Sequence, residues 1–249
     1  MSGVLADKVA VVTGGNSGIG LAITRRFVAE GARVFVTGRR QEQLDAVAAE
    51  LGDAVVPVRA DVGKLADLDA LYAVVREKAG RIDVLAANAG GGVMAPLEEI
   101  TEEQFDSTFA GNVKGVIFGL QKALPLLSPG ASVIVTGSTS SLRPDPGLEV
   151  YGASKAAVRN LVRSWARDAK TRGFRVNVLS PGPTETPGLV GLVAEDQRSG
   201  FLDELASAVP LGRVADPDEI AAAALFLASD AASFVNGAEL FVDGGYVQV

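Results

Sequence analysis

The 249-residue chain contains neither cysteine nor histidine. Without cysteine it forms no disulfide and has no thiolate nucleophile, and without histidine it has no Ser-His-Asp triad or Cys/His zinc site. A metal held by carboxylates alone is still conceivable, but no calcium-loop pattern is present, so we predict no metal site. Any proton transfer must therefore use tyrosine, lysine, aspartate, glutamate or water.

The sequence also lacks long apolar runs and an excess of positive charge. No apolar run reaches the roughly 18–20 residues that span a bilayer, and the first residues lack the features of a secretory signal. A net charge of −7 argues against a polyanionic partner, since phosphate backbones select basic surfaces. With 48% hydrophobic residues the chain can bury a core. We expect a cytoplasmic protein that binds neither membrane nor nucleic acid.

Short β-branched segments alternate with longer helical ones. The predicted strands are Lys8–Thr13, Arg33–Thr37, Ala54–Arg59, Ile82–Ala86, Ser132–Thr136, Phe174–Leu179 and Glu239–Val242. The predicted helices are Gly18–Glu30, Gln41–Leu51, Lys64–Ala79, Thr101–Leu127, Tyr151–Thr171 and Asp216–Ala228. This alternation predicts a doubly wound, largely parallel α/β sheet of Rossmann type. No linker or repeat interrupts it, so we predict a single domain over residues 1–249.

The irregular segments are Gly90–Pro96, Ser138–Leu148 and Pro181–Gly200, and each follows a predicted strand. In open α/β sheets the ligand lies outside the carboxyl ends of the strands. We therefore expect these three segments to gather around one site.

A glycine-rich segment joins the first strand to the first helix. It contains Gly14, Asn16, Ser17, Gly18, Ile19 and Gly20, with the glycine spacing G-x-x-x-G-x-G from Gly14. Such glycines let the backbone approach a pyrophosphate, which then rests on the N–H groups at the positive end of the helix. The alternative is a turn that only packs helix on strand. A strand before it and a helix after it favour the dinucleotide site.

The end of the second strand bears on which dinucleotide binds. An NAD enzyme is expected to carry an acidic residue there for the ribose 2′-hydroxyl. The chain instead continues as Gly38-Arg39-Arg40, and a guanidinium can pair with the 2′-phosphate of NADP(H). The alternative is that Arg39 and Arg40 only face solvent. We predict that NADP(H) is preferred, with NAD(H) possible.

One of the three tyrosines stands out as a candidate acid–base. Tyr151 precedes Lys155 by four residues, so on a helix their side chains share a face. An ammonium nearby stabilises a phenolate and lowers the pKa of the phenol. Ser138 follows the predicted strand Ser132–Thr136 and can donate to a substrate oxygen, although Ser140 and Ser141 compete for that role. Tyr72 and Tyr246 are predicted to pack.

Further segments follow other strands. Asn88, Ala89 and Gly90 follow the fourth strand, and their small size would let a cofactor approach the backbone. The turn Pro181–Thr186 follows the sixth strand and offers backbone and hydroxyl groups to an amide.

Taken together, these motifs resemble the single-domain branch of the short-chain dehydrogenase/reductase family over the whole chain. The matching stretches are Thr13–Gly20, Asp61-Val62, Asn88-Ala89-Gly90, Asn112, Ser138, Tyr151–Lys155, Pro181–Thr186 and Val242–Gly245.

The resemblance implies a role for each matching residue. Tyr151 would exchange the proton, Lys155 would lower its pKa and bind the nicotinamide ribose, and Ser138 would hold the substrate oxygen. Asn112 would anchor a water linking Lys155 to solvent, unless it is only a capping or packing amide. The remaining cofactor contacts would be Asp61 and Val62 with adenine, and Pro181, Gly182, Thr184 and Thr186 with the carboxamide end.

The sequence thus predicts an oxidoreductase that moves a hydride reversibly between NADP(H) and a ketone, aldehyde or secondary alcohol. Relatives form tetramers through the long helices Thr101–Leu127 and Tyr151–Thr171, so a homotetramer is expected. An acyl-carrier-protein reductase is an alternative, for which Arg143, Arg159, Arg163 and Arg167 could form a basic patch. A non-catalytic dinucleotide sensor is disfavoured, because Tyr151 and Lys155 are both present.

Overall fold

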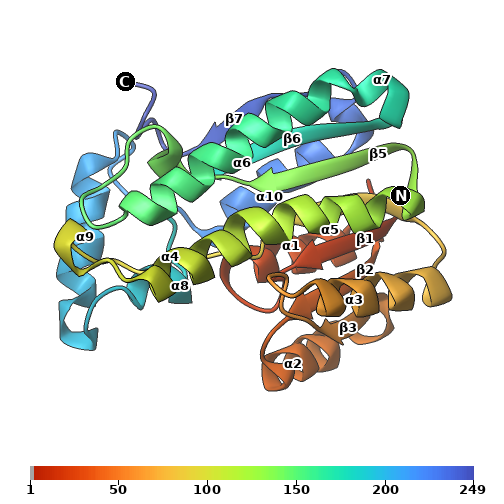
Figure 1. Ribbon diagram of the computed structural model, residues 1–249, viewed down its shortest axis with the longest axis horizontal. Coiled ribbons are helices and arrows are strands. Elements are labelled where there is room, and N and C mark those ends of the chain that lie inside the picture. Colours follow the sequence, from red (N-terminus) through yellow and green to blue (C-terminus); the bar gives the residue numbers. More distant parts are fainter. Residues whose placement is uncertain (1–2) are drawn as a thin grey trace.

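A parallel β-sheet forms the centre of the computed structural model, which describes residues 3–249 (Figure 1). Within that range the sheet has seven strands in the order β3-β2-β1-β4-β5-β6-β7. The strands are β1 (Val9–Thr13), β2 (Arg33–Gly38), β3 (Val55–Arg59), β4 (Ile82–Ala87), β5 (Leu127–Thr136), β6 (Phe174–Pro181) and β7 (Glu239–Val242). The winding reverses between β1 and β4, where such sheets bind ligands. The predicted doubly wound α/β fold is confirmed.

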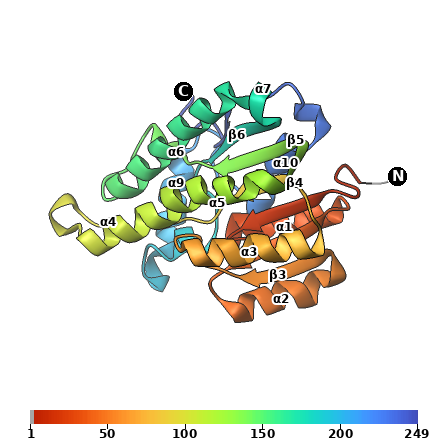
Figure 2. The ribbon, with the colours of Figure 1, turned by 45° about the vertical axis from the view of Figure 1, so that its right-hand side comes forward.

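Helices cover both faces of the sheet, as Figure 2 shows from a second direction. One face carries α3 (Leu65–Lys78), α5 (Gly115–Ala123) and α6 (Glu149–Arg167), with α4 (Glu102–Phe109) leading into α5. The other face carries α1 (Gly18–Ala29), α2 (Gln41–Leu51) and α10 (Pro217–Ala228). The remaining α-helices of the described range are the short α7 (Ala169–Arg172) and α8 (Pro187–Val190) and the longer α9 (Arg198–Ala208). No helix among residues 3–249 is long and apolar enough to cross a membrane.

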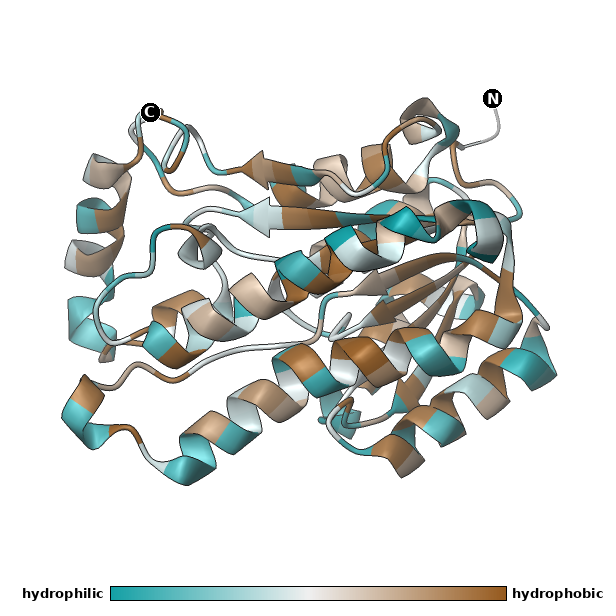
Figure 3. Ribbon diagram, turned by 45° about the horizontal axis from the view of Figure 1, so that its top comes forward, coloured by the Kyte–Doolittle hydropathy of each residue, from teal (hydrophilic) through white to brown (hydrophobic). Residues whose placement is uncertain are grey.

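The core forms because successive strand residues point to opposite faces. In β1, Val9 and Val11 join the cluster under α3, α5 and α6, while Ala10 and Val12 join the cluster under α1 and α10. Every residue of β1 is buried. Figure 3 shows the matching hydropathy pattern, with apolar colour along the strands and polar colour on the outer helix faces. The near-continuous apolar strands therefore reflect helices on both sides.

The predicted helix Thr101–Leu127 is not continuous. The α-helical hydrogen bonding stops at Phe109, a π-helical turn covers Ala110–Lys114, and α5 then runs to Ala123. The π turn contains Asn112, which is 1% exposed. Such turns often mark functional sites in α-helices. The helical prediction was therefore wrong in its regularity, and it ran too far at its end, because a 3-10 turn covers Leu124–Leu126 and Leu127 already belongs to β5.

Other element boundaries differ from the prediction. Strand β5 begins at Leu127, which pairs with Ile82 before a register shift, so it is longer than the predicted segment from Ser132. Helix α6 begins at Glu149, so Tyr151 lies inside its first turn rather than opening it. It ends at Arg167, and α7 covers the rest of the predicted helix. The segment predicted as irregular after Pro181 contains α8 and the start of α9.

Candidate active site

The glycine-rich turn after β1 forms a tight cradle against the end of β4. Gly14 has a φ of +65°, and a Cβ there would lie 2.9 Å from the Cα of Ala89. A Cβ on Gly20 would lie 2.1 Å from the carbonyl oxygen of Gly14. Within residues 3–249, the Ser17 side chain makes no capping bond to the first turn of α1. Those backbone N–H groups therefore suit an anion, and the cradle fits the pyrophosphate of a dinucleotide.

Three strand ends are tied together beside this cradle. The Thr13 hydroxyl accepts hydrogen bonds from the backbone N–H groups of Asn88 and Ala89, each at 3.0 Å. The Thr136 hydroxyl donates to the Asn88 side-chain oxygen at 3.2 Å. The carboxyl ends of β1, β4 and β5 are thus held in fixed positions. The sequence motifs Thr13–Gly20 and Asn88–Gly90 come together here.

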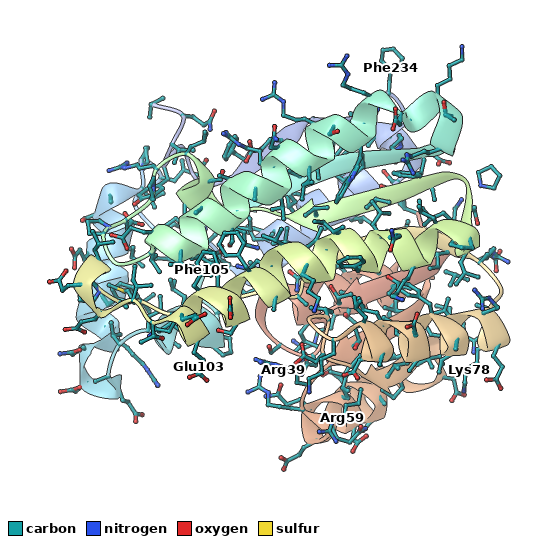
Figure 4. All side chains as sticks on the ribbon, viewed as in Figure 1. Arg39, Arg59, Lys78, Glu103, Phe105 and Phe234 are labelled. Carbon is teal, nitrogen blue, oxygen red and sulfur yellow. The ribbon has the colours of Figure 1, made fainter. Side chains whose placement is uncertain are left out.

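The end of β2 presents arginines beside the cradle. Arg39 and Arg40 are exposed, and Arg59 at the end of β3 donates through Nε to the Arg39 carbonyl at 3.2 Å (Figure 4). A Cβ added to Gly38 would lie 2.4 Å from Asn16 Oδ1. The Asn16 amide is itself held by a 2.8 Å bond to Gln43 Oε1. Asn16 thus occupies the space that a larger residue at the strand end would need.

The segment after β6 reaches the same cradle. A Cβ on Gly18 would lie 3.3 Å from Thr186 Cβ, and the Thr186 hydroxyl accepts from Leu189 N at 3.1 Å, which caps α8. Thr184 is buried, with its hydroxyl donating to Gly182 O at 2.9 Å. Asp61, after β3, accepts from the backbone N–H of Gly63 at 3.0 Å.

Tyr151, Lys155 and Ser138 meet at the carboxyl end of β5. The Lys155 ammonium donates to Thr136 O at 2.8 Å and lies 5.6 Å from the centroid of the Tyr151 ring. The Ser138 hydroxyl accepts from Ser140 N at 3.1 Å. Ser141, one of its competitors, turns away and donates to Glu239 at 3.3 Å. The hydroxyl that is hydrogen-bonded to the Tyr151 phenol is that of Ser138.

Burial controls the ionisation of this pair in the cofactor-free protein. Burial raises the pKa of the Tyr151 phenol, while its hydrogen bond with Ser138 acts in the opposite direction. Burial also lowers the pKa of the Lys155 ammonium from 10.5 to about 8. The phenol pKa is therefore raised rather than lowered as the sequence suggested. Desolvation outweighs the hydrogen bond with Ser138.

Asn112 connects the π turn to the loop after β4. Its side chain donates to Gly91 O at 2.9 Å and accepts from Gly91 N at 2.9 Å. The same amide donates to the Ser154 hydroxyl at 2.8 Å. Because Ser154 lies on α6 between Tyr151 and Lys155, Asn112 holds the loop and α6 at a fixed separation.

Comparison with known proteins gives matches over nearly the whole chain. A family model described as enoyl-(acyl carrier protein) reductase matches residues 14–247. The chain is 48% identical over 247 residues to oxidoreductase asL5 of Sarocladium schorii, covering 98% of both proteins. It is 36% identical to the NADP-dependent (R)-specific alcohol dehydrogenase of Lentilactobacillus kefiri, covering 99% of both. A 3-ketoacyl-(acyl-carrier-protein) reductase from Brucella melitensis, solved with NADH, superposes with a TM-score of 0.90 at 34% identity, covering 97% of this chain and 99% of that one.

The chain belongs to the short-chain dehydrogenase/reductase family. It is therefore an oxidoreductase of the class that binds NAD(P)(H) and acts on CH–OH groups or the corresponding carbonyls. The resemblance drawn from the sequence motifs is confirmed.

The structure of this short-chain dehydrogenase/reductase also shows residues that sequence reasoning missed. Glu239, on β7, accepts from the Ser180 hydroxyl at 2.8 Å and from Ser141, and its other oxygen lies 3.7 Å from Arg159 Nη1. Through its bond with Ser141, this carboxylate stabilises the turn that follows Ser138. In the sequence it stands in a short strand-like segment, with no neighbouring signal that points to the site. Gly92 is a second such residue, because its backbone lies against the Tyr151 ring.

Proposed function

We propose that this protein moves a hydride reversibly between NADP(H) and a ketone, an aldehyde or a secondary alcohol, with Tyr151 as the acid–base. This proposal rests on one observation: the Tyr151 phenol, the Ser138 hydroxyl and the Lys155 ammonium lie close together at the carboxyl end of β5. The nicotinamide, when bound, supplies or accepts the hydride. The protein's own groups orient the substrate oxygen and move its proton.

Each side chain has a defined task in this proposal. During reduction Tyr151 gives its proton to the substrate oxygen, and during oxidation it takes that proton back. The Ser138 hydroxyl donates to the same substrate oxygen and stabilises its developing charge. The Lys155 ammonium, held by Thr136 O, supplies positive charge that favours the phenolate.

The test of the acid–base role is Tyr151→Phe, which removes one hydroxyl and little volume. Turnover should fall by the ~10²–10⁴ that general acid–base catalysis contributes. NADPH affinity, measured by quenching of protein fluorescence, should stay within about threefold of the original protein, which serves as the matched control. Near-normal turnover by the Phe variant would refute the assignment.

The cofactor preference rests on the exposed pair Arg39 and Arg40 and on the small space beside Gly38. An acidic side chain at position 38 would have to displace Asn16, whereas the exposed guanidinium groups of Arg39 and Arg40 can pair with a 2′-phosphate. We expect a higher kcat/KM with NADPH than with NADH. Arg39→Ala should weaken NADPH binding at least tenfold and leave NADH binding nearly unchanged. Equal losses for both cofactors would contradict the role of this arginine.

A carrier-protein-linked substrate is the second candidate function, favoured by the family model and by the Brucella melitensis reductase. One arginine of the predicted basic patch is paired with a carboxylate, and another stacks on an aromatic ring. Arg143 lies over the Tyr246 ring at 4.7 Å from its centroid, and Arg159 is paired with Glu239. Only Arg163 and Arg167 of that set are exposed without such a role. Comparing a free 3-oxo ester with its carrier-bound counterpart at equal concentration separates the two functions.

We further infer that residues 1–249 act as one domain within a homotetramer built through α4, α5 and α6. Phe105 on α4 is 45% exposed and stacks on Phe109 with ring centroids 4.5 Å apart, and exposed aromatic pairs of this kind suit a protein interface. Sedimentation of the protein and of Phe105→Asp measures the assembly. A sedimentation coefficient unaffected by the substitution would argue against this interface.

A further inference from the structure

The loop after β4 passes directly over the ring of Tyr151. A Cβ built on Gly92 would lie 2.8 Å from both Cβ and Cδ2 of Tyr151 and 3.0 Å from its Cγ. Real Cβ atoms essentially never approach a heavy atom more closely than 3.0 Å. The backbone of Gly92 therefore lies where any other residue would push against the phenol.

The need for glycine at this position concerns space and not backbone conformation. Neither Gly91 nor Gly92 is among the glycines of residues 3–249 that have a positive φ. Neither residue therefore requires glycine for a left-handed backbone. The two neighbours differ in what a side chain would meet, since a Cβ on Gly91 has nothing within 4 Å.

The loop has little freedom to move away from the ring. The Asn112 side chain is hydrogen-bonded to both the N–H and the carbonyl of Gly91, and it also donates to the Ser154 hydroxyl on α6. The Ser154 hydroxyl donates to the Tyr151 carbonyl at 2.6 Å. Further along the loop, Ala95 N donates to Gly147 O at 3.0 Å. The loop and the start of α6 are thus joined on both sides of Gly92.

We propose that Gly92 is a positioning residue that sets the place of the Tyr151 ring relative to Ser138 and Lys155. This proposal rests on the proposed function of Tyr151 as the acid–base. A side chain at position 92 displaces the phenol, and the proton transfer then loses its alignment with the substrate oxygen. Misplacement by about 1 Å is enough to slow an enzymatic step by ~10²-fold.

The experiment compares Gly92→Ala with Gly91→Ala as a matched control. Each adds one methyl group to the same loop, one residue apart. We expect Gly92→Ala to lower kcat for ketone reduction at least tenfold, with KM and the NADPH dissociation constant within threefold of the original. The pH at which alcohol oxidation reaches half its plateau should move as well. Gly91→Ala should stay within twofold of the original in every measurement.

Two further variants distinguish a failure of this inference from a failure of the proposed function. Combining Gly92→Ala with Tyr151→Phe should give no lower kcat than Tyr151→Phe alone, because the misplaced group is then already missing. If Tyr151→Phe shows its expected loss but Gly92→Ala matches Gly91→Ala, the positioning role is wrong. If Tyr151→Phe retains turnover, the proposed function itself fails, and this inference fails with it.

Folding provides the last control. If Gly92→Ala does not yield folded protein by circular dichroism, Tyr151→Gly is added to remove all three side-chain atoms that the new methyl would meet. Recovery of folding in the double variant supports the contact between residue 92 and the ring. Tyr151→Gly alone is the control for this step, and a double variant that remains unfolded when Tyr151→Gly folds overturns the contact.

Discussion

Replacing Lys155 with methionine should make the cofactor-free protein more stable at neutral pH. Lys155 is 4% exposed, and burial lowers its pKa from 10.5 to about 8. A pKa change of that size corresponds to about 3 kcal/mol of destabilisation while the ammonium is charged. Methionine has a similar length and no charge. It also loses the hydrogen bond from this charged donor to Thr136 O, worth roughly 1.5–3 kcal/mol. The expected net gain is therefore about 1 kcal/mol at pH 7.

The stability difference between Lys155→Met and the original protein should depend on pH. The folded state binds the lysine proton more weakly than the unfolded state, so the penalty is fully present below about pH 8. It shrinks as the pH rises from 8 to 10.5 and is absent above that range. The advantage of Lys155→Met should therefore disappear towards pH 10, where the lost hydrogen bond leaves the variant slightly less stable.

Urea unfolding, followed by the fluorescence of the single tryptophan, measures both quantities. Both proteins are compared without cofactor, at one protein concentration, at pH 7.0 and pH 9.5. Lys78→Met is the control, because Lys78 is exposed and should change stability by less than about 0.5 kcal/mol at either pH. A Lys155→Met variant that is less stable at pH 7, or whose difference from the original is the same at both pH values, would refute the reasoning.

Three further predictions concern other parts of the protein. Alcohol oxidation should speed up with pH and then level off as Tyr151 ionises, and Lys155→Met should move this rise to higher pH at saturating cofactor. Tyr72→Phe should leave stability unchanged or raise it by up to ~1 kcal/mol in urea unfolding, because among residues 3–249 its buried hydroxyl has no hydrogen-bond partner. A loss above that amount would indicate a bound water. Glu239→Ala should lower stability by roughly 1–3 kcal/mol, since it leaves the buried Ser180 unpaired, and Glu239→Gln should recover part of this loss.

The elements with strong local patterns could be predicted from the sequence. The seven strands of the described range were placed within a residue or two, except β5, because runs such as Val9–Thr13 are almost wholly apolar. The early part of β5 was missed because Pro129 and Gly130 are typical of a turn. In the structure Leu127 nevertheless pairs with Ile82, ahead of an irregular register. Pairing across the sheet overrode the local propensity.

The candidate site was predictable in its residues and not in its geometry. Spacing alone placed Tyr151 and Lys155 on one helical face, and the order of motifs gave the cofactor cradle. The π turn at Asn112 could not be predicted, since it depends on bonds to Gly91 and Ser154 from distant segments. The raised pKa of Tyr151 likewise follows from burial, which a sequence pattern does not show. The roles assigned to individual site residues and the cytoplasmic location stay predictions.

The packing of Asn16 against Gly38 constrains how cofactor preference can evolve. A direct change of Gly38 to aspartate places its new Cβ 2.4 Å from Asn16 Oδ1, so the amide must rotate and lose its bond with Gln43. A smaller residue at position 16 removes that obstacle first. The two substitutions are therefore non-additive, and their order decides whether the intermediate protein remains functional. Lineages that reach an NADH-selective form are expected to change position 16 before position 38.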